Sequence, residues 1–126
     1  MKAAGALVTL PDMRRIALTL ALLAASALPA AAQAYSGNWA CRDATTNRVG
    51  ILTIYGQVYG WASRTPGDPA SGTGAITPYQ DGVGFSDGNL RSTSNITAGR
   101  MIPDPTYGSA LQLETAEAIV MMCTPR

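Results

Sequence analysis

The sequence predicts an all-β fold: a small antiparallel meander barrel of about eight short strands with one disulfide, preceded by a helical signal peptide. Three observations lead to this prediction. Short runs of alternating apolar and polar residues are separated by Gly, Pro, Asn and Asp, as in sandwiches and barrels. No stretch after residue 34 has helical periodicity. Two cysteines lie near the two ends of the same region. A two-sheet sandwich is the alternative.

The first 34 residues have the pattern of a secretory signal peptide. Met13-Arg14-Arg15 supplies a positive start, residues 16–25 are apolar, and Ala32-Gln33-Ala34 forms a small-x-small cleavage site. We expect cleavage after Ala34, which leaves residues 35–126 as a single β domain of 92 residues. The leader indicates a periplasmic or secreted protein.

Two alternatives for the leader stay open. Residues 16–34 approach the length of a membrane span, so that the leader would be kept as an anchor rather than cleaved. Met13 is a possible true start, because the region before the apolar run is long for a signal peptide if Met1 begins the chain. With the leader cleaved, we expect no association with a membrane.

Cys41 and Cys123 are the only cysteines of the sequence. In an oxidising compartment two cysteines most simply form one disulfide. Its geometry requires the two Cα atoms to lie about 4.4–6.8 Å apart, which brings the first and last strands together.

Alternation and turn residues define the first three strands. Trp39 and Cys41 share one face of a strand at 38–42, and Leu52 and Ile54 share one face of a strand at 50–55. Gly56-Gln57 fits a two-residue hairpin that leads into a third strand at 58–63.

The middle of the chain contains two further strands, at 74–79 and 83–86, after an exposed loop at 65–69. Asp81-Gly82 and Asp87-Gly88 are strong turn dipeptides, and we expect hairpin turns at both. A calcium loop over residues 81–88 is the alternative, since two Asp-Gly pairs could supply hard oxygen ligands.

The last part of the chain contains an irregular strand at 94–102, then strands at 110–114 and 118–124. Pro103-Asp104-Pro105 is expected to form a loop, because proline does not fit a central strand. The continuous apolar run 119–122 predicts a strand covered on both faces. Eight consecutive strands with joined ends predict a closed barrel without exposed edges.

The opening Gly37-Asn38-Trp39 resembles the Gly-x-Trp start of calycin-like barrels, which include lipocalins, avidins and small periplasmic inhibitors of metalloproteases. The inhibitors are nearest in size, and the resemblance implies an eight-stranded barrel that uses its new N-terminus, Tyr35-Ser36-Gly37, to enter a protease cleft. The cysteines depart from the inhibitor pattern, because Cys41 and Cys123 span the domain. The spacing of its Gly, Trp and Cys residues also resembles uncharacterised small secreted bacterial β domains, which implies no function.

Composition argues against catalysis. The sequence has no histidine, and its only lysine lies in the leader, so that Ser-His, Cys-His and Schiff-base chemistry are excluded from residues 35–126. Carboxylate pairs remain, either Asp43 with Asp81 or Glu114 with Glu117, and we expect both pairs to be solvated surface charges. We predict no enzyme activity, no cofactor and no metal.

Charge also argues against nucleic acid as a partner. Residues 35–126 contain six arginines against seven Asp and Glu residues, a formal net charge of −1, and no run of basic residues.

Aromatic residues supply the candidate binding site. Tyr59 and Trp61 share one face of the strand at 58–63, with Tyr55 and Tyr79 nearby in the sequence. If these rings point inward they are core. If they point outward they form a rigid amphipathic patch of the kind favoured at interfaces.

These observations together favour a periplasmic or secreted, non-catalytic binding module that holds a protein or glycan partner through the aromatic face or the loop ends. A protease-inhibitor-like protein and a structural component of the envelope are the alternatives.

Overall fold

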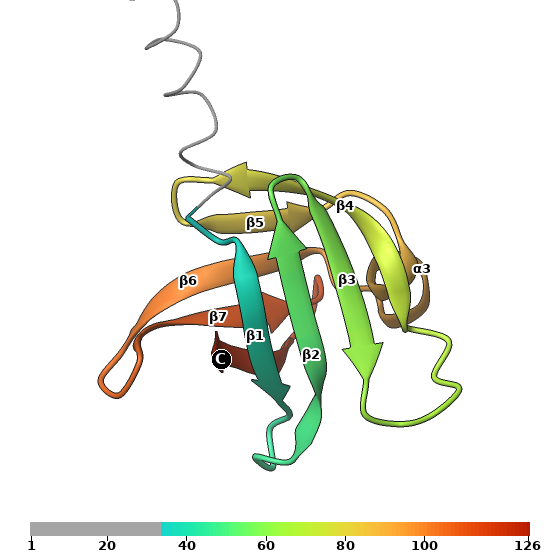
Figure 1. The fold of residues 1–126 in the computed structure, drawn as a ribbon, viewed down its shortest axis with the longest axis horizontal. Coiled ribbons are helices and arrows are strands. Elements are labelled where there is room, and N and C mark those ends of the chain that lie inside the picture. Colours follow the sequence, from blue (N-terminus) through green and yellow to red (C-terminus); the bar gives the residue numbers. More distant parts are fainter. Residues whose placement is uncertain (1–33) are drawn as a thin grey trace, which may run out of the picture. The chain divides into compact units, whose positions relative to one another are not determined.

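The computed structural model describes residues 34–126, and the predictions about the leader, its cleavage and Met13 lie outside them. Eight antiparallel strands follow one another around a closed barrel, each paired with its neighbours in sequence (Figure 1). The strands are β1 (Gly37–Arg42), β2 (Arg48–Tyr55), β3 (Val58–Ser63), β4 (Gly72–Tyr79), β5 (Gly82–Phe85), β6 (Ala98–Asp104), β7 (Gly108–Glu114) and β8 (Ile119–Pro125). A short helix, α3 (Asn89–Ser94), lies beside β4.

Pairing of the first strand with the last closes the barrel. Ala40 is opposite Thr124, and Cys41 is opposite Cys123, to which it is joined by a disulfide. The predicted antiparallel barrel and the Cys41–Cys123 bond are therefore confirmed, and the two-sheet sandwich is not observed.

Alternate residues of the strands fill the interior. Aromatic side chains of the strands that lie inside are Trp39, Tyr59, Trp61 and Phe85, none more than 5% exposed. Leu90 of α3 is fully buried as well, so the helix closes part of the core. Within the described residues no buried polar side-chain atom lacks a hydrogen-bond partner.

Three expectations for the second half of the chain were wrong. Asp87-Gly88 does not form a hairpin turn, because Gly88 precedes α3. The absence of any helix after residue 34 was also expected, but α3 is present. With six residues and only Leu90 buried, it is too short to give a periodic sequence signal. β6 continues through Pro103 and Asp104, paired with β7, because the ladder there lies at the outer end of the strand pair, where a missing N–H is tolerated.

The apolar run 119–122 had predicted a last strand covered on both faces, and this prediction was wrong. Ile119 is 56% exposed, and Val120, Met121 and Met122 are only partly buried. In a barrel with nothing packed outside it, every second residue of a strand faces outward whatever its hydropathy.

Removing the disulfide by Cys41→Ala with Cys123→Ala should lower the free energy of unfolding by about 2–5 kcal/mol, because the bond closes a long loop of the unfolded chain. Urea denaturation of the double variant and of the oxidised protein measures the difference. Equal denaturation midpoints would show that strand pairing alone closes the barrel.

Candidate functional site

Tyr59 and Trp61 point into the barrel, so the inward alternative holds and the four predicted rings do not form one exposed face. Tyr59 is 2% exposed and packs edge-to-face on Phe85 at 5.1 Å between ring centroids. Its hydroxyl donates to the Asp87 carbonyl, and burial raises its pKa. Trp61 is 4% exposed and lies over Gly50, where a Cβ atom would come within 2.7 Å of the indole.

Tyr55 and Tyr79 are the exposed members of the predicted set, and they lie apart. Tyr55, 80% exposed, ends β2 and borders a shallow depression over β2, β3 and β4. Tyr79, 55% exposed, ends β4 and borders another depression near β5 and β6. No single ligand-sized aromatic platform results from these two rings.

The segment before β1 packs against the barrel. Tyr35 is 3% exposed, and its hydroxyl donates to the Tyr79 carbonyl. The indole N–H of Trp39 donates to the Tyr35 carbonyl at 2.9 Å, and the Gly56 amide donates to the Ser36 hydroxyl at 3.1 Å.

The predicted carboxylates serve as local hydrogen-bond and ion-pair partners. Asp43 accepts from the Thr45 hydroxyl and amide in the β1–β2 turn, and the Thr45 hydroxyl lowers its pKa. Glu114 pairs with Arg100 at 3.2 Å. Asp87 accepts from the Ala75 amide at 2.7 Å. Among residues 34–126, no three potential metal-ligating side chains cluster.

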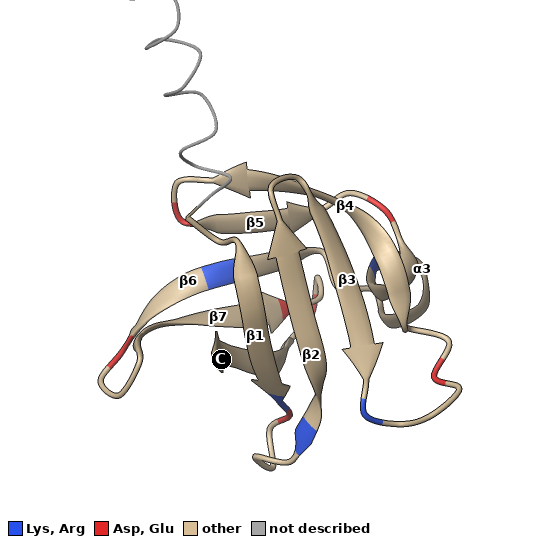
Figure 2. Ribbon diagram, viewed as in Figure 1, with Lys and Arg blue, Asp and Glu red and all other residues tan. Residues whose placement is uncertain are grey.

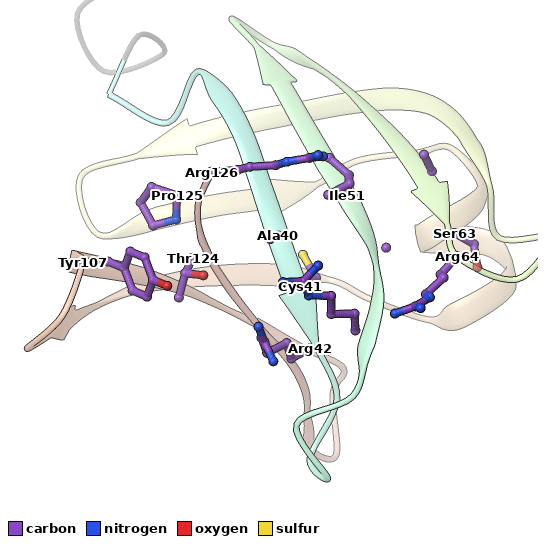
Figure 3. A pocket seen from close by; sticks show the side chains of 13 residues that line it. Ala40, Cys41, Arg42, Ile51, Ser63, Arg64, Tyr107, Thr124, Pro125 and Arg126 are labelled. Carbon is purple, nitrogen blue, oxygen red and sulfur yellow. The ribbon is translucent and has the colours of Figure 1, made fainter.

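A groove on the outside of the barrel collects most of the arginines. It has a volume of about 550 Å³ and crosses β1, β2, β3 and the end of β8 (Figure 3). Four of the six arginines of residues 35–126 line it, and no acidic residue does. We call it the arginine groove; its arginines are Arg42, Arg48, Arg64 and Arg126.

Small and aliphatic side chains form the floor of the arginine groove. Ala40 of β1 is opposite Ile51 of β2, and Ile51 is opposite Ala62 of β3. Residues directly opposite on neighbouring strands lie about 4.5–5.5 Å apart, so the floor is a continuous row across three strands. Tyr107, 54% exposed, borders the groove on the side of the β6–β7 turn.

Three of the arginines come together because β1, β2 and β3 have adjacent ends (Figure 2). Arg42 ends β1 and is directly opposite Arg48, which begins β2. Arg64 follows β3, and its amide donates to the Val49 carbonyl at 2.8 Å, which holds it beside the same end of β2.

The Arg42–Arg48 pair is an unfavourable arrangement for stability. Like charges directly opposite on neighbouring strands are destabilising. The register also shifts between Cys41 and Arg42, and such bulges commonly redirect side chains next to functional sites. The Arg42 guanidinium donates to the Thr46 carbonyl at 3.2 Å, which fixes its direction without neutralising it.

Nearby carboxylates do not neutralise the groove. Asp43, Asp68 and Asp104 all accept backbone amide hydrogens in their own turns. In the part of the chain that the structure describes, the one ion pair is Arg100–Glu114, away from the groove. The four guanidinium groups therefore remain available to an external anion.

No family model, curated protein or solved structure matches this chain. The eight-stranded antiparallel barrel, with Gly37 and Trp39 on its first strand, is compatible with a calycin-like layout. Any function must therefore be argued from the site itself.

Sequence reasoning missed the arginine groove. Arg48 was expected to lie outside the second strand, and Arg64 and Arg126 have no neighbouring basic residue in the sequence. One signal existed: Arg42 and Arg48 flank a turn-rich segment that joins two predicted antiparallel strands, which places them near each other.

The variant Trp61→Ala should lose about 3–5 kcal/mol of unfolding free energy, because it removes a buried ring from a packed core. Tyr55→Ala, its exposed control, should change that free energy by no more than about 0.5 kcal/mol. Urea denaturation followed by circular dichroism measures both. A Trp61→Ala protein as stable as the parent would contradict the assignment of Trp61 to the core.

Replacing Arg48 by Thr should raise the unfolding free energy at low ionic strength by about 0.5 kcal/mol, because it removes the like charge opposite Arg42. The gain should shrink as salt screens the pair. Arg100→Thr is the control and should have the opposite sign, since it breaks the ion pair with Glu114. Thermal unfolding at low and high salt tests this; destabilisation by Arg48→Thr would show that Arg48 contributes to the fold instead.

Proposed function

We propose that residues 35–126 form a periplasmic or secreted, non-catalytic binding module that holds an anionic ligand on the outer wall of its barrel. The observation that carries this proposal is the arginine groove: four guanidinium groups without an ion pair surround a shallow floor, and no Asp or Glu is among the lining residues. Guanidinium groups bind carboxylates and phosphates through two parallel hydrogen bonds.

The packed interior supports an external ligand. Trp39, Tyr59, Trp61 and Phe85 occupy the centre of the barrel with their rings buried. A small apolar ligand of the lipocalin kind would have to displace them. The exposed grooves of the outer wall are the alternative binding surfaces.

Side-chain chemistry supports a non-catalytic module. The sequence has no histidine, and both cysteines are in the disulfide. Asp43, next to Arg42 in the sequence, and Asp104, at the β6–β7 turn, both accept backbone amide hydrogens in their own turns.

The predicted leader and the disulfide support the proposed location. An apolar leader with a cleavage site indicates export, and a single bond across the whole domain is typical of an oxidising compartment. Between residues 34 and 126, no helix has the length and hydropathy needed to cross a membrane.

The inhibitor-like alternative is less well supported. Its mechanism requires the segment around Tyr35-Ser36-Gly37 to enter a protease cleft, whereas Tyr35 is buried and hydrogen-bonded to the barrel. Deleting this segment should weaken the fold as well as any inhibition.

Ion-exchange chromatography on a carboxylated resin at neutral pH tests the proposal. The domain has a net charge of −1, so retention requires a local basic surface. We expect the domain to be retained at about 50 mM NaCl, where screening is weak, and to elute at higher salt. Arg42→Gln with Arg48→Gln should abolish most of this retention.

The matched control is Arg91→Gln with Arg100→Gln, which makes the same change in net charge on other surfaces. It should elute close to the parent protein. Equal shifts for the two double variants would mean that retention follows net charge, and the arginine groove would then not be a binding site.

A further inference from the structure

We infer that the ligand of the arginine groove is an extended acidic polypeptide segment with a carboxylate on each side of an aliphatic side chain. This inference rests on the proposed function and names its ligand class.

The cations lie on both sides of the apolar floor, not in one patch. Asn38, Ala40 and Arg42 are successive outward-facing residues of β1, with Ala40 in the floor. Arg42 lies on one side of Ala40. On the other side, the amide of Arg126 donates to the Asn38 carbonyl at 3.0 Å, and Figure 3 shows the Arg126 side chain on that side.

The spacing between Ala40 and the cations on its two sides fits an extended peptide. Residues two apart on one face of a strand are about 6.8 Å apart, and the same distance separates residues two apart on one face of a bound extended chain. A segment with the pattern acid-x-aliphatic-x-acid therefore places one carboxylate toward Arg42 and Arg48, and the other toward Arg126. Its central side chain then lies on Ala40 and Ile51.

The chemistry of the floor favours a polypeptide over a glycan or a nucleic acid. Sugar rings and bases are commonly held by stacking on aromatic rings. Here the floor is Ala40, Ile51 and Ala62, and the one aromatic ring among the lining residues, Tyr107, is at the border. Such a floor offers aliphatic contact instead.

Barrel closure also determines how the peptide is recognised. β1 and β2 are hydrogen-bonded on both sides, and the Ser63 amide of β3, which lies beyond the β3–β4 ladder, donates to the Ser71 hydroxyl, so the groove offers no open strand edge for main-chain pairing. Recognition must come from side chains, that is, from guanidinium–carboxylate hydrogen bonds and the aliphatic contact. This makes binding dependent on the acidic pattern and on salt.

Titration of the isotope-labelled domain with the peptide Ser-Glu-Ser-Leu-Ser-Glu-Ser, followed by NMR, tests the inference. We expect a dissociation constant of about 0.1–1 mM, with the largest shifts at the groove arginines. Replacing both Glu by Gln, or Leu by Gly, should weaken binding about tenfold. Arg42→Gln with Arg48→Gln should do the same, and Arg91→Gln with Arg100→Gln should not.

The outcomes separate this inference from the proposed function. If a uronic-acid oligosaccharide or an oligothymidylate bound more tightly than the peptide, and the Arg42–Arg48 double variant lost this binding, the inference of a peptide ligand would be wrong. The proposal of an anion-binding groove would still be supported. Binding of none of these three probes to the groove would overturn both. If the Arg42–Arg48 double variant does not fold, the double variant Arg64→Gln with Arg126→Gln tests ligand binding at the same groove.

Discussion

Pairing of β1 with β8 is the constraint on which the rest of the structure depends. It joins residues 80 or more positions apart, and the Cys41–Cys123 disulfide links two residues that are directly opposite each other. Without this contact the eight strands would form an open sheet with two unpaired edges. With it, every strand is paired along both edges, and one face of each strand packs against a single core.

The same closure builds the arginine groove. Arg126 follows β8 and reaches the floor only because β8 lies against β1, while Arg42, Arg48 and Arg64 come from the adjacent ends of the first three strands. Cys41 lies beneath the floor between these groups. The disulfide therefore stabilises the fold and joins the two strands, β1 and β8, that lead to Arg42 and Arg126. The cost of placing Arg42 opposite Arg48 is small beside the free energy of a packed barrel, so the fold tolerates it.

The aromatic residues show how a residue pattern can have two meanings. Tyr59 and Trp61 alternate with Val58, Gly60 and Ala62, and both faces of β3 were compatible with either orientation. Packing in the interior determines the inward orientation of the rings. Gly50 leaves space for the Trp61 indole, and Phe85 contacts the Tyr59 ring. Small residues such as Ala62 are left outside, where they form a smooth floor rather than a binding platform of rings.

By itself the sequence determined the all-β class, the order of the strands and the disulfide, because alternation, turn residues and a pair of cysteines are local or countable signals. It did not determine α3, whose six residues bury one leucine, nor the continuation of β6 through Pro103. For a basic surface it offered only the placement of Arg42 and Arg48 around one turn, since the other arginines are scattered and the net charge of residues 35–126 is −1. Only the tertiary structure decided that four of them meet, because strand register and barrel closure, not proximity along the chain, set which outward side chains become neighbours.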